Sequence, residues 1–382
     1  MQSVSSHSIA RRLSVPLSIA ALIAAAPCAC AVAAATGTSY GVIERWQLGG
    51  GGGWDYLSLD SSGKQLFIAR SDRVEVVDTA TGKSLGIVPD LKGAHGVALD
   101  EPAKRGYASD GKGNAVIVFD LDTRKTIQQV AVPGQNPDAI LYEPQGKHVF
   151  TFNGRSKDVT VFDAAGMRVE KTIAVPDKPE FAVDDGHGQI FDNIETEPGQ
   201  MVVIDSGKLE VTHTWALPGC NSPSGLALDR KHRRLFSVCV DNVMVVTDAD
   251  TGRQVAKVRI GAGPDAVAYD AERGLVFSSN GDGTLTVLKQ NSADSYSVAQ
   301  TVTTQKGART MALDPSTGRA YTVTSEFGPA PAATADAPHP RPAVIPGTFS
   351  VIVVGGRGRS AAPVPATPRD SAGSRTADRQ GR

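Results

Sequence analysis

The stretch from residue 94 to residue 134 reads AHGVALDEPAKRGYASDGKGNAVIVFDLDTRKTIQQVAVPG. It holds four short runs in which apolar residues alternate with small or polar ones, and each run ends at polar residues or glycine. Alternation with a period of two over four to eight residues is typical of β-strands. The stretch therefore predicts four consecutive short strands joined by tight turns.

The same pattern recurs seven times along the chain. In each copy an alternating strand ends at an acidic residue, a polar turn follows, and a second apolar and aromatic strand comes next. The seven acids lie 40 to 44 residues apart: Asp60, Asp100, Glu143, Asp185, Asp229, Asp270 and Asp314. Four antiparallel strands per repeat at this period are the signature of a propeller blade. The chain is therefore predicted to be all-β, a seven-bladed β-propeller with four-stranded antiparallel blades.

The last copy ends after its third strand, near Val354. The segment YGVIERWQLG, residues 40–49, has the pattern of a fourth strand and no blade of its own. We expect this N-terminal strand to complete the last blade, because closing the ring removes exposed strand edges.

Residues 1–35 differ in composition from the rest of the chain. Arg11 and Arg12 precede an apolar run over residues 13–26, and AVAAA precedes Thr36. This is the pattern of a secretory signal peptide, and the arginine pair leaves both the general and the twin-arginine export routes open. We predict a signal peptide over 1–35, cleaved near Ala35, and a propeller over 36–354. The mature protein is predicted to have no transmembrane segment and to be periplasmic or secreted.

The residues after Val354 are rich in Gly, Pro, Ser and Ala and contain six arginines, so a disordered basic tail is predicted over 355–382. The propeller body, residues 36–354, carries 31 basic and 38 acidic residues. Proteins that bind nucleic acid need clustered positive charge. The acidic body therefore argues against nucleic acid as a partner.

A run of five glycines, Gly49 to Gly53, precedes the first alternating strand. A phosphate-binding loop needs a helix after the glycines and a Lys-Ser or Lys-Thr pair. Here another strand follows and no such pair closes the run. The run is therefore predicted to be a slack connection between two strands.

Two segments resemble a known repeat. GYASDGKGNAVIVFDLDTRK, residues 106–125, and HVFTFNGRSKDVTVFDAAGMR, residues 148–168, are similar to the YVTN repeat, in which an aromatic-Val-x-Asn strand and a polar turn precede N-x-V-x-V-I-D-x-x-T-G. Over about residues 40–354 the chain resembles the YncE-like, YVTN-repeat β-propellers that bacteria export. The resemblance implies a seven-bladed fold and binding of a ligand or a partner, and it offers no catalytic motif.

Loops that precede the innermost strands converge on the central channel of a propeller, and such loops commonly bind ligands. Five positions before each of the seven acids stands a residue that is ionisable in six copies: Asp55, His95, Asp138, Glu180, Ser224, Asp265 and Arg309. We predict that this first-strand ring lines the channel mouth and binds a small polar ligand, a cation or a peptide. The alternative, that strand starts near solvent are simply polar, remains open.

Two other functions remain open at the same mouth. His95 together with four carboxylates would suit a divalent metal ion, as in a metal-binding or metal-delivery protein. His95 paired with Glu180 would suit the acid–base chemistry of a lyase. The sequence identifies no cofactor. It predicts an exported, non-catalytic binding protein. The protein is expected to be a monomer, because a closed ring has no built-in need for a second subunit.

Three further features complete the prediction. A second-strand ring, ten positions after each acid, is expected to shape the rim of the mouth: Arg70, Asp110, Asn153, Glu195, Cys239, Asn280 and Thr324. Cys220 and Cys239, the two cysteines beyond residue 35, are predicted to form a disulfide after export. An insertion with six prolines, residues 326–349, should emerge on the mouth face as a linker or as a strap.

Overall fold

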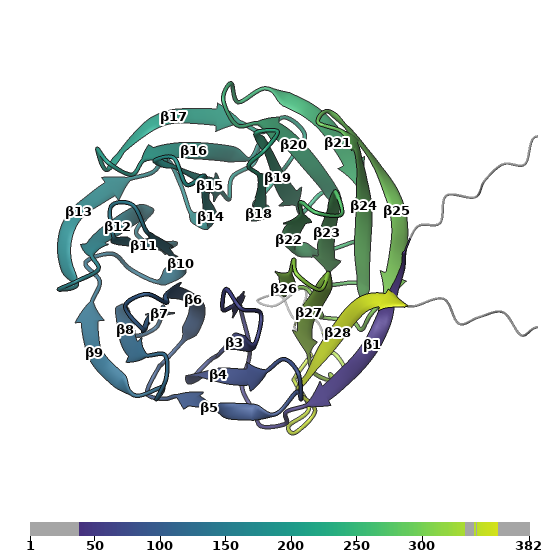
Figure 1. Ribbon diagram of the computed structural model, residues 1–382, viewed down its shortest axis with the longest axis horizontal. Helices are drawn as coiled ribbons and strands as arrows, with labels where there is room; N and C mark the ends of the chain where they lie inside the picture. The colour runs from purple at the N-terminus through teal and green to yellow at the C-terminus, as the bar shows by residue number, and fades with distance from the viewer. Residues whose placement is uncertain (1–37, 333–339, 341, 358–382) are drawn as a thin grey trace, which may run out of the picture. The chain divides into compact units, whose positions relative to one another are not determined.

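The computed structural model describes residues 38–332, 340 and 342–357. The predicted signal peptide and most of the predicted tail lie outside these residues. The described residues form seven antiparallel sheets of four strands each, without a helix among them. Figure 1 shows the sheets following one another around a ring, with the first strand of each innermost. The predicted seven-bladed β-propeller is confirmed.

The strand bounds define the blades. Blade 1 consists of β2 (Leu57–Leu59), β3 (Gln65–Arg70), β4 (Arg73–Asp78) and β5 (Ser84–Val88). Blade 2 consists of β6 (Ala94–Asp100), β7 (Arg105–Asp110), β8 (Ala115–Asp120) and β9 (Thr126–Ala131). Blade 3 consists of β10 (Pro137–Glu143), β11 (His148–Asn153), β12 (Asp158–Asp163) and β13 (Arg168–Ala174). Blade 4 consists of β14 (Pro179–Asp184), β15 (Gln189–Ile194), β16 (Gln200–Asp205) and β17 (Glu210–Ala216).

The remaining three blades follow the same plan. Blade 5 consists of β18 (Pro223–Asp229), β19 (Arg234–Cys239), β20 (Val243–Asp248) and β21 (Gln254–Arg259). Blade 6 consists of β22 (Pro264–Asp270), β23 (Leu275–Asn280), β24 (Thr284–Ser292) and β25 (Ser295–Thr303). Blade 7 consists of β26 (Met311–Asp314), β27 (Arg319–Thr324), β28 (Ser350–Arg357) and β1 (Ser39–Gln47). Among the described residues, no helix is long and apolar enough to cross a membrane.

The ring closes through its two ends, as predicted. β1 pairs antiparallel with β28, so that Trp46 lies opposite Val351 and Val42 lies opposite Val354. Figure 1 shows the purple β1 as the outermost strand beside the yellow β28. The last blade is thereby built from both ends of the propeller.

The apolar core lies between the blades. Seven clusters of buried side chains each join two neighbouring blades. The second strand of every blade contributes at least one aromatic ring that is at most 1% exposed: Phe67, Tyr107, Phe150 and Phe152, Phe191, Phe236, Phe277 and Tyr321. Because each blade buries its two faces against its neighbours, the ring holds all the first strands in fixed relative positions.

The glycine run is held in place by contacts, where a slack connection was predicted. The buried Arg70 guanidinium donates hydrogen bonds to the carbonyl oxygens of Gly51 at 2.9 Å and Gly49 at 3.3 Å. It also pairs with Glu75 at 2.9 Å and lies 3.5 Å from the centre of the Phe349 ring. Burial and the nearby Arg73 lower the pKa of Arg70 to about 10. The run depends on glycine for its backbone conformation, because Gly49, Gly50 and Gly52 adopt φ between +69° and +90°, which other residues rarely adopt.

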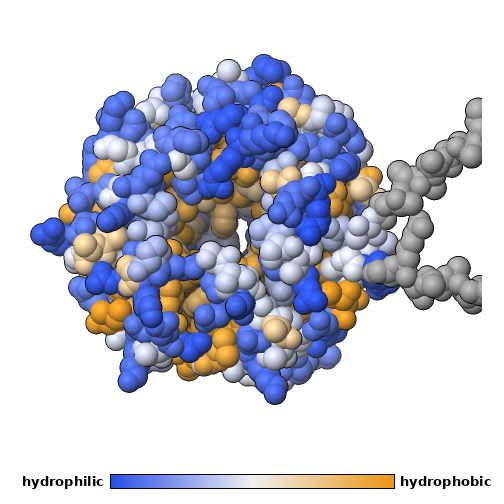
Figure 2. All heavy atoms as spheres, viewed as in Figure 1, coloured by the Kyte–Doolittle hydropathy of each residue, from blue (hydrophilic) through white to orange (hydrophobic). Residues whose placement is uncertain are grey.

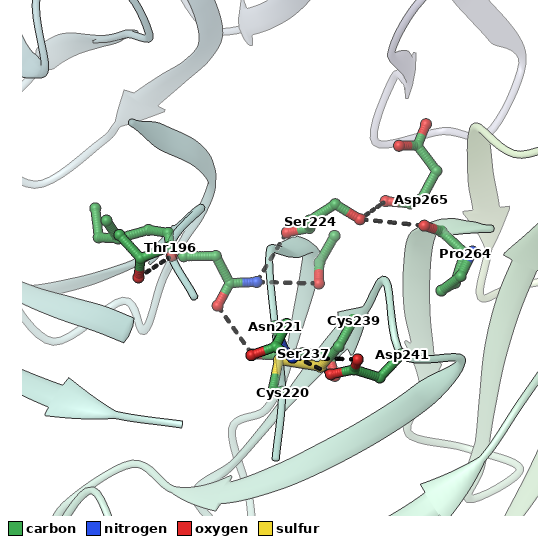
Figure 3. Close-up of a disulfide and its surroundings, with 12 residues drawn as sticks. Thr196, Cys220, Asn221, Ser224, Ser237, Cys239, Asp241, Pro264 and Asp265 are labelled. Carbon is green, nitrogen blue, oxygen red and sulfur yellow. Dashed lines mark hydrogen bonds between the residues drawn. A yellow bond between two sulfur atoms is a disulfide. The ribbon is translucent and has the colours of Figure 1, made fainter. Parts of the chain in front are cut away.

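Cys220 and Cys239 form the predicted disulfide, with their Cα atoms 5.2 Å apart (Figure 3). Both residues are fully buried in blade 5. In the chain-entropy model, closing a loop of this size stabilises the fold by roughly 3 kcal/mol. The bond fixes the loop that leads into β18.

The base of the proline-rich insertion packs beside the channel mouth. Phe327 and Val344 form a β-bridge, and Trp54 lies between Phe327 and Phe349, with ring centres 6.2 and 5.4 Å away. A cavity of about 950 Å³ opens between this base and the loop that carries Arg309. The insertion therefore emerges on the mouth face, as expected.

Candidate functional site

The residues of the first-strand ring occupy one structural position in seven copies. Each stands at the start of an innermost strand, and the pairing between the first two strands is irregular there in blades 2 to 6. In blades 1 and 7 regular pairing begins only after Asp55 and Arg309. Such irregularities redirect a side chain out of the sheet. The first strands surround the central channel in Figure 1, and Figure 2 shows a hollow at the centre of the molecule.

Three members of the ring, from blades 1, 2 and 3, are in direct contact. Nδ1 of His95 lies 2.6 Å from Oδ2 of Asp55 and 3.4 Å from Oδ1 of Asp138. Asp138 is the most buried of the three, at 8% exposed. Burial alone would lower the pKa of His95, but the hydrogen bond to Asp55 and the neighbouring carboxylates raise it overall. Burial raises the pKa of Asp138 to about 6.

Glu180 of blade 4 continues this cluster. The Tyr56 hydroxyl reaches across from blade 1 and donates to the backbone oxygen of Glu180 at 3.0 Å. Lys178 lies 2.6 Å from the Glu180 carboxylate and also pairs with Glu195. Burial and then the charge of Asp138 raise the pKa of Glu180 to about 8, against the opposing effect of Lys178.

The other side of the mouth is less charged. Asp265 pairs with Arg309 at 3.4 Å, and its pKa is raised by burial. Ser224 points its hydroxyl at the neighbouring blade and donates to the backbone oxygens of Asp265 at 3.1 Å and Pro264 at 3.4 Å (Figure 3). Ser224 therefore joins two blades and brings no charge to the mouth.

Sequence spacing did not single out Lys178. The residue two positions before each ring member is small or uncharged in the other six copies: Gly53, Gly93, Asn136, Ser222, Gly263 and Gly307. A lysine at this position in one copy alone departs from the repeat, and that departure could have identified Lys178 from the sequence.

The prediction that Glu195 belongs to the second-strand ring, ten positions after Asp185, was wrong. The turn between β14 and β15 is one residue shorter than in the other blades, so Ile194 pairs with Pro179 where Asn153 pairs with Pro137 in blade 3. Ile194 therefore holds the second-strand ring position, and Glu195 is free to reach Lys178.

Asp192 is a buried carboxylate that the repeat pattern did not reveal. It is fully buried, and no donor among the described residues meets its carboxylate oxygens with good hydrogen-bond geometry. Burial, and then the charge of nearby Glu180, raise the pKa of Asp192 well above its ordinary value. The equivalent residues in the other blades carry no charge: Ile68, Ala108, Thr151, Ser237, Ser278 and Thr322.

Comparison with known sequences gives partial matches. No family model matches the chain. The chain is 30% identical over 119 residues to the WD repeat-containing protein VIP3 of Arabidopsis thaliana, covering 31% of this chain and 34% of that protein. It is 28% identical over 129 residues to the uncharacterized protein YncE of Salmonella typhi, covering 32% and 36%. The chain thus spans about a third of the length of these relatives, and the second match confirms the predicted resemblance.

Comparison with solved structures covers most of the chain. The fold is similar to the crystal structure of the RRP9 WD40 repeats, with a TM-score of 0.66 at 10% identity over 82% of this chain and 97% of that one. It is also similar to a chain in the crystal structure of the mitotic checkpoint complex, with a TM-score of 0.66 at 11% identity over 92% and 99%. At this identity the similarity shows the fold alone.

Proposed function

We propose that this chain, a YncE-like β-propeller, is a non-catalytic binding protein that binds a cation at the mouth of its central channel. The observation that carries the proposal is an imbalance of charge. Five carboxylates gather at the mouth: Asp55, Asp138, Glu180, Glu195 and Asp265. Among the described residues, the cationic groups that pair with them are His95, Lys178 and Arg309.

A buried carboxylate is costly unless a positive charge or hydrogen-bond donors compensate it. The pKa values of Asp138, Glu180 and Asp265 are all raised, with burial as the first cause in each case. A cationic group placed among them would relieve this cost. A lysine or arginine side chain of a protein partner carries such a group, so a protein ligand falls within the proposal.

Binding fits the contacts better than lyase chemistry does. A lyase would need His95 and Glu180 to face a substrate as an acid–base pair. Instead, Nδ1 of His95 lies against Asp55 and Asp138, and Glu180 is engaged by Tyr56 and Lys178. These contacts hold the side chains in place and favour recognition of charge.

The proposed setting is the bacterial periplasm or the outside of the cell. The Cys220–Cys239 disulfide fits an oxidising compartment, and the YncE relatives are bacterial. N-terminal sequencing of the mature protein tests this setting. A start near Thr36 would support export, and retention of Met1 in a cytoplasmic fraction would contradict it.

Thermal unfolding with a panel of cations tests the binding proposal. The panel holds Zn²⁺, Mn²⁺, Ca²⁺, a diamine and an arginine ester, each at saturating concentration. At least one should raise the Tm by several degrees, as ligands that bind only the folded state do. The double variant Asp138→Asn/Asp265→Asn should lose this response. The matched control Asp241→Asn, an exposed acid bonded to Asn221 in blade 5, should keep it. An unchanged response in the double variant would refute the proposed site.

A further inference from the structure

Within the charged mouth, Asp138 has as its nearest cationic group one that it shares with another carboxylate. Lys178 is engaged by Glu180 and Glu195, and Arg309 is engaged by Asp265. Asp55 forms a close hydrogen bond with His95, which satisfies that pair. The remaining carboxylate, Asp138, contacts only the His95 imidazole, at 3.4 Å, and shares it with Asp55.

Asp138 is a polar group buried without a proper partner. Its side chain is 12% exposed, and its ion-pair partner among the described residues is the His95 imidazole. Its nearest polar neighbour is Nδ1 of His95, at 3.4 Å, and that nitrogen is already bonded to Asp55. Buried carboxylates in proteins are paired or coordinate metals. The position of Asp138 thus points to a missing positive charge beside His95.

Nδ1 of His95 and Oδ1 of Asp138 have the spacing of neighbouring ligands in a coordination shell, whereas Oδ2 of Asp55 lies closer to His95. Bonds of about 2.0–2.2 Å from a divalent ion to nitrogen or oxygen place neighbouring ligand atoms about 3.0–3.4 Å apart. The measured separations from Nδ1 of His95 are 2.6 Å to Asp55 and 3.4 Å to Asp138, and all three donor atoms lie within 4.8 Å of one another. An ion could enter after a small opening of the Asp55–His95 contact.

The backbone around these donors is fixed by hydrogen bonds between blades. The Tyr56 amide donates to the carbonyl oxygen of His95 at 3.0 Å, which joins blades 1 and 2. The buried Ser109 hydroxyl accepts from the amide of Gly96 at 2.9 Å and donates to the carbonyl oxygen of Asp138 at 2.6 Å, which joins blades 2 and 3. Ligands held in this way are preorganised, as effective metal sites require.

We propose that Asp55, His95 and Asp138 form a binding site for a first-row divalent metal ion of the Zn²⁺ or Mn²⁺ type, an inference that rests on the proposed cation-binding mouth. One imidazole nitrogen with two carboxylate oxygens suits such ions better than Ca²⁺, which prefers oxygen ligands alone. About a quarter of the side-chain surface of Asp55 and His95 is exposed to the mouth, at 26% and 25%. Three protein ligands leave coordination positions open to water or to a second ligand.

The test is equilibrium dialysis of the full chain, freed of any purification tag and stripped with chelator, against Zn²⁺ and Mn²⁺, with Ca²⁺ as comparator. We expect one Zn²⁺ or Mn²⁺ per chain and weaker binding of Ca²⁺. Asp138→Asn and His95→Gln should each weaken transition-metal binding at least tenfold, since even outer partners of a metal site contribute about 10–100-fold. The control His213→Gln, which changes an exposed histidine in β17, should bind as the wild type does.

Circular dichroism shows whether each variant is folded, and Asp55→Asn serves as a second carboxylate variant if Asp138→Asn is not. Co²⁺ added in place of Zn²⁺ provides a spectroscopic check, because His95→Gln should change its visible absorption bands. Metal uptake that is unaffected in the folded variants, or no uptake by the folded wild type, would overturn the metal site. If organic cations still bind and Asp138→Asn abolishes that binding, the metal site fails while the proposed function stands.

Discussion

The first-strand ring and the second-strand ring both contain charged residues, yet they differ in what surrounds them. Every second-strand ring position is 0% exposed: Arg70, Asp110, Asn153, Ile194, Cys239, Asn280 and Thr324. Several of their side chains hold neighbouring loops by hydrogen bonds, as when Arg70 donates to the carbonyl oxygen of Gly51 and Thr324 donates to that of Lys306. The first-strand ring instead gathers carboxylates that outnumber their cations. Residue type and the balance of partners together separate a structural ring from a candidate binding ring.

The largest effect on stability should come from the second-strand ring. Arg70→Met should lower the free energy of unfolding by about 3–5 kcal/mol, because it leaves the buried Glu75 without its partner and the glycine carbonyls without a donor. Urea unfolding measures the loss. The double variant Arg70→Met/Glu75→Leu should recover part of it. A loss below 1 kcal/mol in the single variant would show that Arg70 does not organise the glycine run.

Removing the disulfide should have the next largest effect. Cys220→Ser/Cys239→Ser should lower the free energy of unfolding by roughly 3 kcal/mol, since the unfolded chain regains the freedom of the closed loop. The comparison is between the oxidised wild type and the variant in the same urea titration. Equal stabilities would mean that the bond contributes nothing to the fold.

The first-strand ring should give the protein a pH-dependent stability. The folded chain holds the proton of Glu180 up to a pKa of about 8, whereas the unfolded chain releases it near the ordinary value of 4.5. The free energy of unfolding should therefore fall as the pH rises from about 5 to 8. Glu180→Gln should reduce the fall by about 1 kcal/mol or more. Urea titrations at both pH values measure this, and an identical fall in the variant would count against the assignment.

The smallest effect on stability should come from Asp138. Asp138→Asn removes a buried charge without changing side-chain volume, so the free energy of unfolding should stay within about 0.5 kcal/mol of the wild type or rise. The same variant should lose cation binding. A fall of several kcal/mol in the free energy of unfolding would show that Asp138 is structural, as the second-strand ring residues are, and would contradict the distinction between the two rings.

The fold could be predicted because the same pattern is written seven times. An ambiguous turn in one copy, such as the one after Asp185, is outweighed by six clear ones. The closure of the ring could also be predicted. The segment that begins at Tyr40 has a strand pattern but no blade of its own, and the last blade lacks a fourth strand after Val354. The order that Arg70 imposes on the glycine run was not predicted, because a contact between residues about 20 positions apart leaves no local pattern.

The candidate site could be predicted only in outline. Constant spacing found the members of the first-strand ring, but it could not show that Ser224 turns toward a neighbouring carbonyl group. The spacing also did not identify Lys178 or Asp192. The positions equivalent to Lys178 in the other blades hold small or uncharged residues, and those equivalent to Asp192 hold uncharged ones. The most informative residues at the mouth are those that depart from the repeat, and a search for the repeat passes over them.

Isothermal titration of the most stabilising cation into wild-type protein, Asp138→Asn and the control Asp241→Asn is the most direct test of the claim that uncompensated carboxylates make the mouth a cation site. The account predicts one bound ion per chain for the wild type and the control, and an affinity at least tenfold lower for Asp138→Asn with its fold intact. Equal affinity in all three proteins would contradict it.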